Sequence, residues 1–458
     1  MIDDAQVQTF RQQLRGMLAQ PADAGYDAAR RLFNAMIDKR PRLIVQCADV
    51  ADVMTAVRFA RANALLLAVR GGGHNGGGLG SCDDGMVIDL GRLRGLRVDP
   101  AAHSVRAEGG CTWGEVDHAT HAFGLATPSG VISTTGVGGL TLGGGIGYLS
   151  RRFGLTIDNL LSVDMVLADG SFVTASAKVN EDLFWAVRGG GGNFGVVTSF
   201  EFRLHDLSTV VAGPTLWPLE RAAEVLRWYR GFLPSAPPEL NGFFAFITVP
   251  PAPSFPPELH LQKMCGIVWC YAGDAAHADA ALAPVRAMAP VLDGLASMPY
   301  PVLQSAFDGL YVPGLHWYWR ADFVNELSDS AIALHVKHGA QMPTLHSSMH
   351  LYPIDAAVHR VGRKETAFAA RDARWAAVYL GVTPDPAQGE QVAQWSKDYW
   401  QALHPHAAAG AYVNFMMDEG QDRVKAAYRD NYARLAAIKA RYDPDNLFRV
   451  NQNIRPAG

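Results

Sequence analysis

The chain has 458 residues, of which 49% are hydrophobic and 18% charged, with a formal net charge of -4. This is the composition of a globular protein with room for two or three domains. The slightly acidic balance argues against a nucleic-acid partner, which needs a basic face to neutralise phosphates. Five cysteines, an odd number in so long a chain, do not form the pattern of a disulfide framework. No apolar stretch approaches the ~18 residues of a membrane span, so we expect a cytoplasmic protein with no membrane partner.

The spacing of apolar residues predicts the elements of the N-terminal part in chain order. A short amphipathic helix is expected over 5–18, and a linking segment then leads to a strand at 43–45. A helix over 49–62 and a strand at 65–69 complete a β-α-β opening. The elements expected after it are a strand at 86–88, a hairpin of 96–98 with 104–107, a helix over 113–123, and strands at 164–167 and 172–175.

The character of the sequence changes near residue 208, where glycine thins out and aromatic residues become frequent. We therefore divide the chain into 1–207, with its glycine clusters, and 208–415, a second α+β domain that carries substrate contacts. The segment 416–458 is expected to return to the first domain. It contains a predicted helix over 422–440 and a polar tail at 451–453.

The most informative local feature is a glycine loop that directly follows the predicted strand at 65–69. It reads Arg-Gly-Gly-Gly-His-Asn-Gly-Gly-Gly-Leu-Gly over 70–80, with His74 as its one reactive side chain. Because glycine has no side chain, the backbone N–H groups of such a loop can approach and bind the oxygens of a diphosphate. Gly71, Gly73 and Gly76 match a dinucleotide fingerprint of the Rossmann type, but that fingerprint needs a helix opening on its last glycine and an acidic residue about twenty positions on. The loop continues instead, so we reject the Rossmann interpretation.

Two further glycine clusters, at 136–147 and 189–195, follow in the same half of the chain. Glycine loses the most conformational freedom on folding, so three such loops are costly. A large ligand spread over several loops explains them better than a small one.

Four ordered motifs resemble the berberine bridge enzyme-like branch of the vanillyl-alcohol oxidase flavoproteins. They are the Arg-Gly-Gly-Gly-His-Asn loop, the Thr-Gly-Val-Gly-Gly loop, the segment over 182–197, and the tail Tyr-Asp-Pro-Asp-Asn-Leu-Phe-Arg-Val-Asn-Gln-Asn-Ile. The resemblance implies an α+β fold: a PCMH-type FAD-binding domain of two α/β subdomains, completed by the C-terminal tail, and an α+β substrate domain with an antiparallel sheet. The positions it assigns to FAD are Arg70, Gly71, Gly72, Gly73, Asn75, Gly76, Leu79, Thr134, Gly136, Gly138, Gly139, Gly143, Asn193, Gly195, Val196, Val197, Asn451 and Asn453.

The resemblance also assigns the attachment of the flavin. In that family the histidine of the first loop bonds through a ring nitrogen to the 8α-methyl of the flavin, so His74 is the expected covalent anchor. Many members carry a second bond through a cysteine, whose place is taken here by Ile132. Cys111 lies in a different loop and is expected to be a packed core residue. We therefore expect FAD bonded through His74 only, with no cysteinyl link.

Flavin oxidation of a C–H bond also needs a group that takes the proton of the adjacent O–H or N–H. By resemblance, Tyr412, Tyr148 and Tyr379 fall where the family places active-site side chains, and Tyr412 is the first choice as base. Strand alternation puts Tyr379 on one face with Trp375. A tyrosine pKa of about 10 must fall by roughly 3 units for half ionisation at pH 7, which needs a nearby cation or a proton that moves in concert with hydride. The candidate cations are Arg363, Lys364, Arg371 and Arg374.

No metal site is expected, because the paired histidines of the chain come without a clear carboxylate or thiolate set. His350 and Tyr352 could face the substrate by strand alternation. The aromatic run at 315–319 suits a flat or ring-bearing substrate, and it equally suits core packing.

The sequence thus predicts an FAD-dependent oxidoreductase that removes hydride from an alcohol or amine carbon of a small organic molecule. Dioxygen or another electron acceptor would reoxidise the flavin. Two alternatives stay open: an oxidative cyclase or tailoring enzyme of secondary metabolism, and a flavin-binding protein without turnover.

Overall fold

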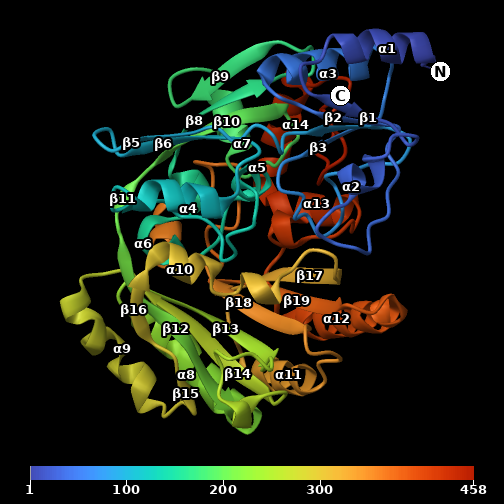
Figure 1. Ribbon diagram of the computed structural model, residues 1–458. Helices are drawn as coiled ribbons and strands as arrows, with labels where there is room; N and C mark the ends of the chain where they lie inside the picture. Colours follow the sequence, from blue (N-terminus) through green and yellow to red (C-terminus); the bar gives the residue numbers. More distant parts are fainter. Residues whose placement is uncertain (1) are drawn as a thin grey trace.

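Residues 2–458 are described by a computed structural model, a mixed α+β fold with sheets of four, five and eight strands (Figure 1). The two smaller sheets lie at one end of the molecule together with the C-terminal helices, and the eight-stranded sheet lies at the other. This is the mixed α+β class expected from the sequence, with the antiparallel sheet in its second half.

The four-stranded sheet has the order β1 (Met17–Ala19), β2 (Leu43–Gln46), β4 (Met86–Asp89) and β3 (Leu67–Arg70). Helix α3 (Val50–Ala62) joins β2 to β3, as predicted, but β4 lies between these two strands and is parallel to both. The first glycine loop therefore leaves the carboxyl end of a parallel strand, which is where open sheets of this kind place ligands.

The predicted N-terminal helix is shorter than expected. Helix α1 (Asp4–Gln12) ends early, and the chain turns into β1. The carboxylate of Asp52 on α3 accepts the backbone N–H groups of Arg15 and Gly16, both at 2.8 Å. These long-range hydrogen bonds replace the helical ones and pull the chain out of the helix.

The five-stranded sheet is antiparallel, with the order β5 (Leu96–Asp99), β6 (Ser104–Glu108), β10 (Val196–Arg203), β8 (Leu160–Val166) and β9 (Phe172–Ser176). Helix α4 (Trp113–His121) packs on it through Trp113, whose ring lies 5.4 Å from that of Phe202. The second glycine cluster forms helix α5 (Val137–Gly143), and the third joins helix α7 (Glu181–Val187) to β10.

The eight-stranded sheet is antiparallel throughout. Its order is β15 (Leu292–Asp293), β12 (Thr209–Pro218), β14 (Lys263–Tyr271), β13 (Leu240–Thr248), β18 (Ser348–Pro353), β19 (Trp375–Thr383) and β17 (His316–Val324), and β16 (Ala296–Pro299) also pairs with β12. Helices α8 (Ala222–Ser235), α11 (Asp329–Ala340) and α12 (Gly389–Leu403) cover one face. The other face packs toward the glycine-rich half. The remaining elements are α2 (Tyr26–Arg30), β7 (Leu125–Ala126), α6 (Ser150–Phe153), β11 (His205–Asp206), α9 (Ala278–Ala287) and α10 (Tyr300–Ser305).

The C-terminal segment differs from the single helix expected over 422–440. It forms α13 (Gln421–Tyr428) and α14 (Tyr432–Tyr442), separated at Arg429, whose φ of 49° ends the first helix. On α14, the buried Lys439 ammonium contacts Asp443 and the backbone oxygens of Asn193 and Phe448, at 2.6, 2.6 and 3.0 Å. These contacts hold the tail against the third glycine cluster.

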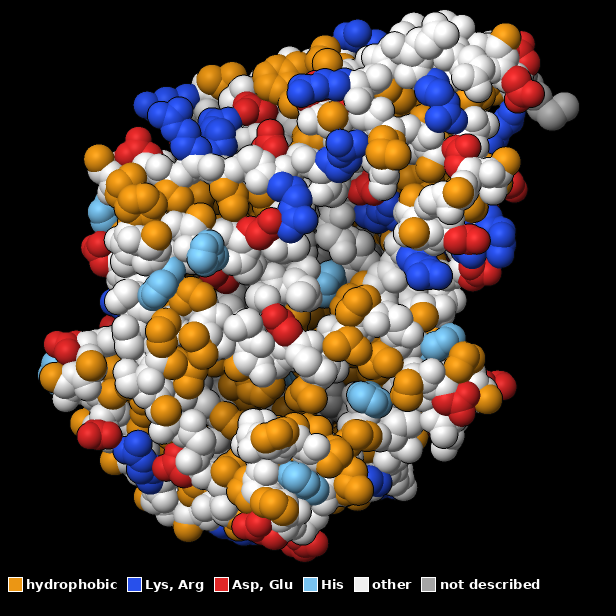
Figure 2. Space-filling view, viewed as in Figure 1, with side chains coloured by type: hydrophobic (Ala, Val, Ile, Leu, Met, Phe, Trp, Pro, Cys, Tyr) orange, Lys and Arg blue, Asp and Glu red, His pale blue; other side chains and the backbone are white. Residues whose placement is uncertain are grey.

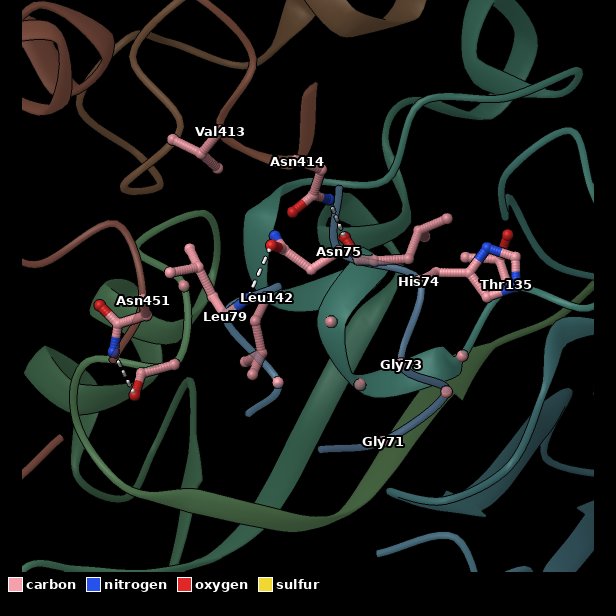
Figure 3. Close-up of a pocket in the computed structure, with 18 of the residues that line it drawn as sticks. Gly71, Gly73, His74, Asn75, Leu79, Thr135, Leu142, Val413, Asn414 and Asn451 are labelled. Carbon is pink, nitrogen blue, oxygen red and sulfur yellow. Dashed lines mark hydrogen bonds between the residues drawn. The ribbon is translucent and has the colours of Figure 1, made fainter. Parts of the chain in front are cut away.

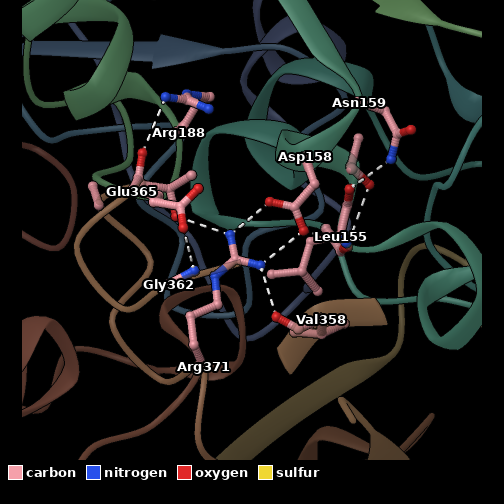
Figure 4. A network of polar contacts seen from close by, with 12 residues as sticks. Leu155, Asp158, Asn159, Arg188, Val358, Gly362, Glu365 and Arg371 are labelled. Carbon is pink, nitrogen blue, oxygen red and sulfur yellow. Dashed lines mark hydrogen bonds and ion pairs between the residues drawn. The ribbon is translucent and has the colours of Figure 1, made fainter. Parts of the chain in front are cut away.

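A buried ion pair joins the two halves of the molecule (Figure 4). The guanidinium of Arg371 donates to both carboxylate oxygens of Asp158, at 2.7 and 2.6 Å, and to the hydroxyl of Thr366 at 2.9 Å. Arg371 was one of the candidate cations for an active-site tyrosine. The structure gives it a carboxylate partner instead, so its role is to fix the two halves against each other.

Replacing Arg371 with methionine is expected to lower the free energy of unfolding by about 3–5 kcal/mol, because it leaves the carboxylate of Asp158 buried without its counter-ion. Urea unfolding of the variant and the parent protein measures this. Arg286→Met removes an exposed partner of Asp279 and should cost less than about 1 kcal/mol. If the two variants lost equal free energy of unfolding, burial of the Arg371–Asp158 pair would not contribute to stability as expected.

Candidate active site

One large cavity lies between the glycine-rich half and the open face of the eight-stranded sheet. It holds about 310 Å³ of water-accessible space, within the usual range of small-molecule and cofactor sites. Figure 2 shows the surface hollowed at the boundary of the two halves, with hydrophobic side chains gathered on the lower side. All three glycine clusters, the C-terminal tail and strands β17, β18 and β19 contribute to its wall.

The glycines of the first two loops allow backbone to pass directly over backbone. A Cβ on Gly72 would lie 2.6 Å from the backbone nitrogen of Gly136, and a Cβ on Gly136 would lie 2.5 Å from that of Gly72. Gly73 has a φ of 69°, which L side chains rarely adopt. The Asn75 side chain accepts the N–H of Leu79 at 3.1 Å and so closes the loop on itself (Figure 3).

His74 lies half-buried at the cavity wall. Its ring stacks on Phe33 with centroids 4.1 Å apart, and its Nε2 lies 3.2 Å from the hydroxyl of Thr134. Burial lowers the pKa of His74 to about 4, although the hydrogen bond at Thr134 opposes this. The imidazole is therefore neutral at pH 7 and has a nitrogen lone pair, as a nucleophile requires.

None of the five cysteines, all within the described part of the chain, lines the cavity. Ile132 does line it. Cys111 is fully buried, its Sγ lies 3.7 Å from the backbone oxygen of Gly95, and burial raises the pKa of its thiol to about 12.

Most of the residues that the sequence assigned to the cofactor line this cavity together. They are Arg70, Gly71, Gly72, Gly73, His74, Asn75, Leu79, Gly136, Gly138, Gly139, Gly195, Val197 and Asn451. The guanidinium of Arg70 is already engaged by Asp89 at 2.7 Å and the backbone oxygen of Ala29 at 2.6 Å, so it supports the loop from behind.

Six assigned positions lie outside the cavity lining: Gly76, Thr134, Gly143, Asn193, Val196 and Asn453. Thr134 still contacts His74. Asn193 is fully buried and joins the third cluster to the tail, since its amide donates to the oxygens of Gly190 and Gln452 and accepts the N–H of Ile454. Thr134 and Asn193 thus contact groups that border the cavity, and they do so from outside its lining.

Tyr412 is the one of the three predicted catalytic tyrosines that lines the cavity. Its hydroxyl oxygen accepts the N–H of Gly145 at 2.8 Å and the amide of Asn414 at 2.7 Å. Burial raises the pKa of Tyr412 to about 12, and the two donors only partly offset it. A neutral phenol oxygen has two lone pairs, and both are engaged here. This geometry suits Tyr412 to donate its own proton in a hydrogen bond, and it disfavours the role of base.

The expectation that Tyr379 is an active-site residue is wrong. Strand β19 does place Tyr379 and Trp375 on one face, but that face is the one covered by helices. The Tyr379 ring lies 4.6 Å from the ring of Tyr399 on α12, whereas Val378 and Leu380 face the cavity. Strand alternation correctly placed Tyr379 and Trp375 on the same face of the sheet, but it could not tell which face borders the cavity.

Tyr148 is also outside the cavity lining. It is buried in the layer behind it, with its ring centroid 6.1 Å from that of Phe243, and its hydroxyl has no hydrogen-bond partner among residues 2–458. Burial raises the pKa of Tyr148 well above the ordinary value.

Aromatic side chains that the sequence left open, or did not indicate, complete the wall opposite the glycine loops. Trp317 and Trp319, two residues apart on β17, line the cavity together, as do Tyr311, Tyr352 and Phe415. Strand alternation within 315–319 contained the signal for the tryptophans. Tyr311 lies in a loop and Asn414 in a single 3-10 turn (Val413–Phe415), so neither has a comparable periodicity.

Several buried polar atoms at the cavity have no hydrogen-bond partner in the described chain: the indole nitrogens of Trp317 and Trp319 and the side-chain oxygen of Asn451. A buried polar group without a partner costs about 1–3 kcal/mol. A large ligand with donors and acceptors along its length would satisfy these atoms. The close glycine contacts and these unpartnered polar atoms fit an elongated cofactor such as FAD.

Within residues 2–458, no cluster of three or more His, Cys, Asp or Glu side chains is arranged to hold a metal ion. Nor does any helix in this range combine the length and apolarity needed to cross a bilayer.

Comparison with known proteins agrees with this geometry. A family model described as an FAD binding domain matches residues 41–176, and one described as berberine and berberine-like matches residues 411–455. An FAD-linked oxidoreductase of Dictyostelium discoideum is 31% identical over 458 residues, which cover 98% of this chain and 97% of the relative. The (R)-6-hydroxynicotine oxidase of Paenarthrobacter nicotinovorans is 30% identical over 97% of this chain and 98% of its own. The solved structure of 6-hydroxy-D-nicotine oxidase from Arthrobacter nicotinovorans superposes with a TM-score of 0.86, at 26% identity over 97% of this chain and 98% of the other.

Proposed function

The chain belongs to the berberine bridge enzyme-like FAD-linked oxidoreductases, and from that premise we propose that it oxidises an alcohol or amine carbon of a small organic molecule. The observation that carries the proposal is the neutral His74 at the wall of a cavity formed by three glycine loops. FAD, when bound, supplies a two-electron acceptor for a hydride from the substrate.

We propose that His74 is the single covalent anchor of the flavin. Its lowered pKa leaves a ring nitrogen free to attack the electrophilic methyl of an oxidised flavin at neutral pH. The place of a second, cysteinyl bond is apolar because Ile132 lines the cavity there. Cys111 is fully buried outside the lining and supplies no alternative.

Tyr412 is the proposed catalytic residue at the substrate. With its oxygen held by Gly145 and Asn414, its O–H proton is free to point into the cavity. A hydrogen bond from this phenol would stabilise the negative charge that develops on the substrate oxygen as its proton leaves.

The chemistry of the wall supports an uncharged, ring-bearing substrate. The lining contains no Lys, Asp or Glu within the described residues, and its arginine, Arg70, is paired with Asp89. Trp317, Trp319 and Phe415 offer flat apolar surface. The oxidase relatives favour dioxygen as the acceptor, and the formal net charge of -4 favours no nucleic-acid partner. We place the protein in the cytoplasm.

An anaerobic reduction assay tests this function. Holoprotein is mixed with a benzylic alcohol (4-methoxybenzyl alcohol), a benzylic primary amine (4-methoxybenzylamine) and a sugar (glucose), and the flavin absorbance is followed. We expect the flavin to bleach with at least one aromatic probe, and hydrogen peroxide to form when air is admitted. A flavin that none of the probes bleaches would contradict the proposal.

A further inference from the structure

A buried histidine lies between two tyrosine hydroxyls of the cavity wall. His350, on β18, is 2% exposed. Its Nδ1 lies 2.7 Å from the hydroxyl of Tyr352, and its Nε2 lies 3.1 Å from the hydroxyl of Tyr311. Both tyrosines line the cavity, whereas His350 itself does not.

The ring of His350 is neutral, because burial lowers its pKa to about 3 and no charged side chain contributes to that shift. A neutral imidazole has one N–H donor and one lone pair. One tyrosine must therefore donate its proton to the ring, while the other accepts the ring N–H. The two hydroxyls are thus coupled: a proton that enters at one end can leave at the other as the ring changes tautomer.

The proposed oxidation needs such an acceptor, because the oxygen of Tyr412 already accepts two hydrogen bonds. The rings of Tyr352 and Tyr412 both pack on Phe415, with ring centroids 5.5 and 4.8 Å from it. All three line the same cavity, so one substrate can reach both tyrosines. Among residues 2–458, the hydroxyl of Tyr352 has a single hydrogen-bond partner, His350.

Resting on the proposed function, we propose that Tyr352, His350 and Tyr311 form a proton relay that takes the hydroxyl or amine proton of the substrate. Tyr352 is the catalytic residue of this relay because it lines the cavity against Phe415, on which Tyr412 also packs. His350 acts through Tyr352 as a positioning residue.

In the oxidation of an alcohol, the C–H bond breaks and its electron pair leaves with the hydride to the flavin. The O–H bond breaks as the carbonyl forms, and its proton goes to the oxygen of Tyr352. The proton of Tyr352 goes to Nδ1 of His350, the proton on Nε2 goes to Tyr311, and Tyr311 releases its own proton to water. Each relay group keeps its number of protons, and no phenolate or imidazolium is formed.

Tyr311 is the more exposed end of the relay. Tyr311 is only half-buried, and the following residue, Val312, is 38% exposed. Tyr352 at the inner end is buried, 7% exposed, beside Phe243 and Phe415. Both tyrosines line the cavity, and Tyr311 is the more exposed of the two.

The chain offers a matched control for the relay. His335 and Tyr399 form a second buried pair, with Nδ1 of His335 2.9 Å from the Tyr399 hydroxyl, on the helix-covered side of the same sheet. His350→Gln keeps a donor and an acceptor but removes a ring that exchanges protons between two nitrogens. His335→Gln makes the same change outside the cavity.

The test measures anaerobic flavin reduction by 4-methoxybenzyl alcohol and by 4-methoxybenzylamine, which carry an O–H and an N–H proton, in the flavin-loaded variants. His350→Gln and Tyr352→Phe are expected to slow reduction at least hundredfold, and Tyr311→Phe at least tenfold, while His335→Gln stays within about twofold of the parent. In the parent protein, rates in mixtures of H2O and D2O should curve with deuterium content, because more than one proton moves. Tyr352→Phe removes one oxygen only, so it decides the outcome if His350→Gln loses flavin.

A second readout is independent of turnover. Nitrogen-15 spectra of histidine-labelled holoprotein, with His350 assigned through His350→Gln, should show one protonated and one bare ring nitrogen at pH 6. An imidazolium there would overturn the relay, and so would parental reduction rates in His350→Gln and Tyr352→Phe. If the parent flavin bleaches but these variants match it, the relay alone fails. If no probe bleaches the parent flavin, the proposed function fails and the relay with it.

Discussion

Replacing His74 with alanine is expected to leave the acid-precipitated protein colourless, with all flavin in the supernatant. The parent pellet should stay yellow. The alanine side chain has no nucleophile for the flavin methyl, and no cysteine of the described chain lines the cavity as a substitute. Because the histidyl bond withdraws electron density from the flavin, the variant reconstituted with FAD should also reduce more slowly. We expect a loss of roughly tenfold, or about 1.4 kcal/mol of barrier.

Cys111→Ala is the matched control for this variant, since it removes the alternative nucleophile and leaves the histidine in place. Its pellet should be as yellow as that of the parent. Flavin that stays with the His74→Ala pellet, or leaves the Cys111→Ala pellet, would contradict attachment through His74.

Replacing Tyr412 with phenylalanine is expected to slow flavin reduction at least hundredfold, with the affinity for the probe changed much less. The loss of a positioned donor to a developing negative charge costs about 10²–10³ in rate. The substitution also leaves the N–H of Gly145 without the phenol oxygen that it bonds. Stopped-flow reduction across a range of probe concentrations separates the limiting rate from the affinity.

Tyr229→Phe is a suitable control for Tyr412→Phe. It removes a buried hydroxyl that bonds the backbone oxygen of Gly242 in the helix-covered layer, far from the cavity wall. Its reduction rate should match the parent. A limiting rate in Tyr412→Phe within threefold of the parent would exclude Tyr412 from the chemistry.

Most residues that the sequence assigned to the cofactor line one cavity, because the signals that mark them are local. A glycine loop after a strand, with one histidine in it, needs only neighbouring residues to be recognised, and the loop does line the cavity beside the end of β3. The fold class followed from the same motifs. The end of α1 did not, because the carboxylate of Asp52, distant in sequence, redirects the chain there.

The substrate half was predicted less well because it depends on which face of a sheet meets the other half of the molecule. Alternation on β19 gave two equivalent choices, and Tyr379 lies on the helix-covered one. On β18 the same alternation could not decide whether His350 and Tyr352 face the substrate. That His350 lies between the hydroxyls of Tyr352 and Tyr311 became visible only in the structure, because Tyr311 comes from a separate loop. Likewise, the lone pairs of the Tyr412 oxygen accept hydrogen bonds from Gly145 and Asn414, and no periodic pattern in the sequence predicts these contacts.

Mass spectrometry of a tryptic digest of the holoprotein tests the central claim most directly. The peptide over 71–92, which follows Arg70, should carry the added mass of FAD, and fragment ions should place it on His74 and not on Cys82. The peptide over 107–151, which contains Cys111, should be unmodified. FAD on either cysteine, or a 71–92 peptide without it, would contradict a flavin held by this histidine alone.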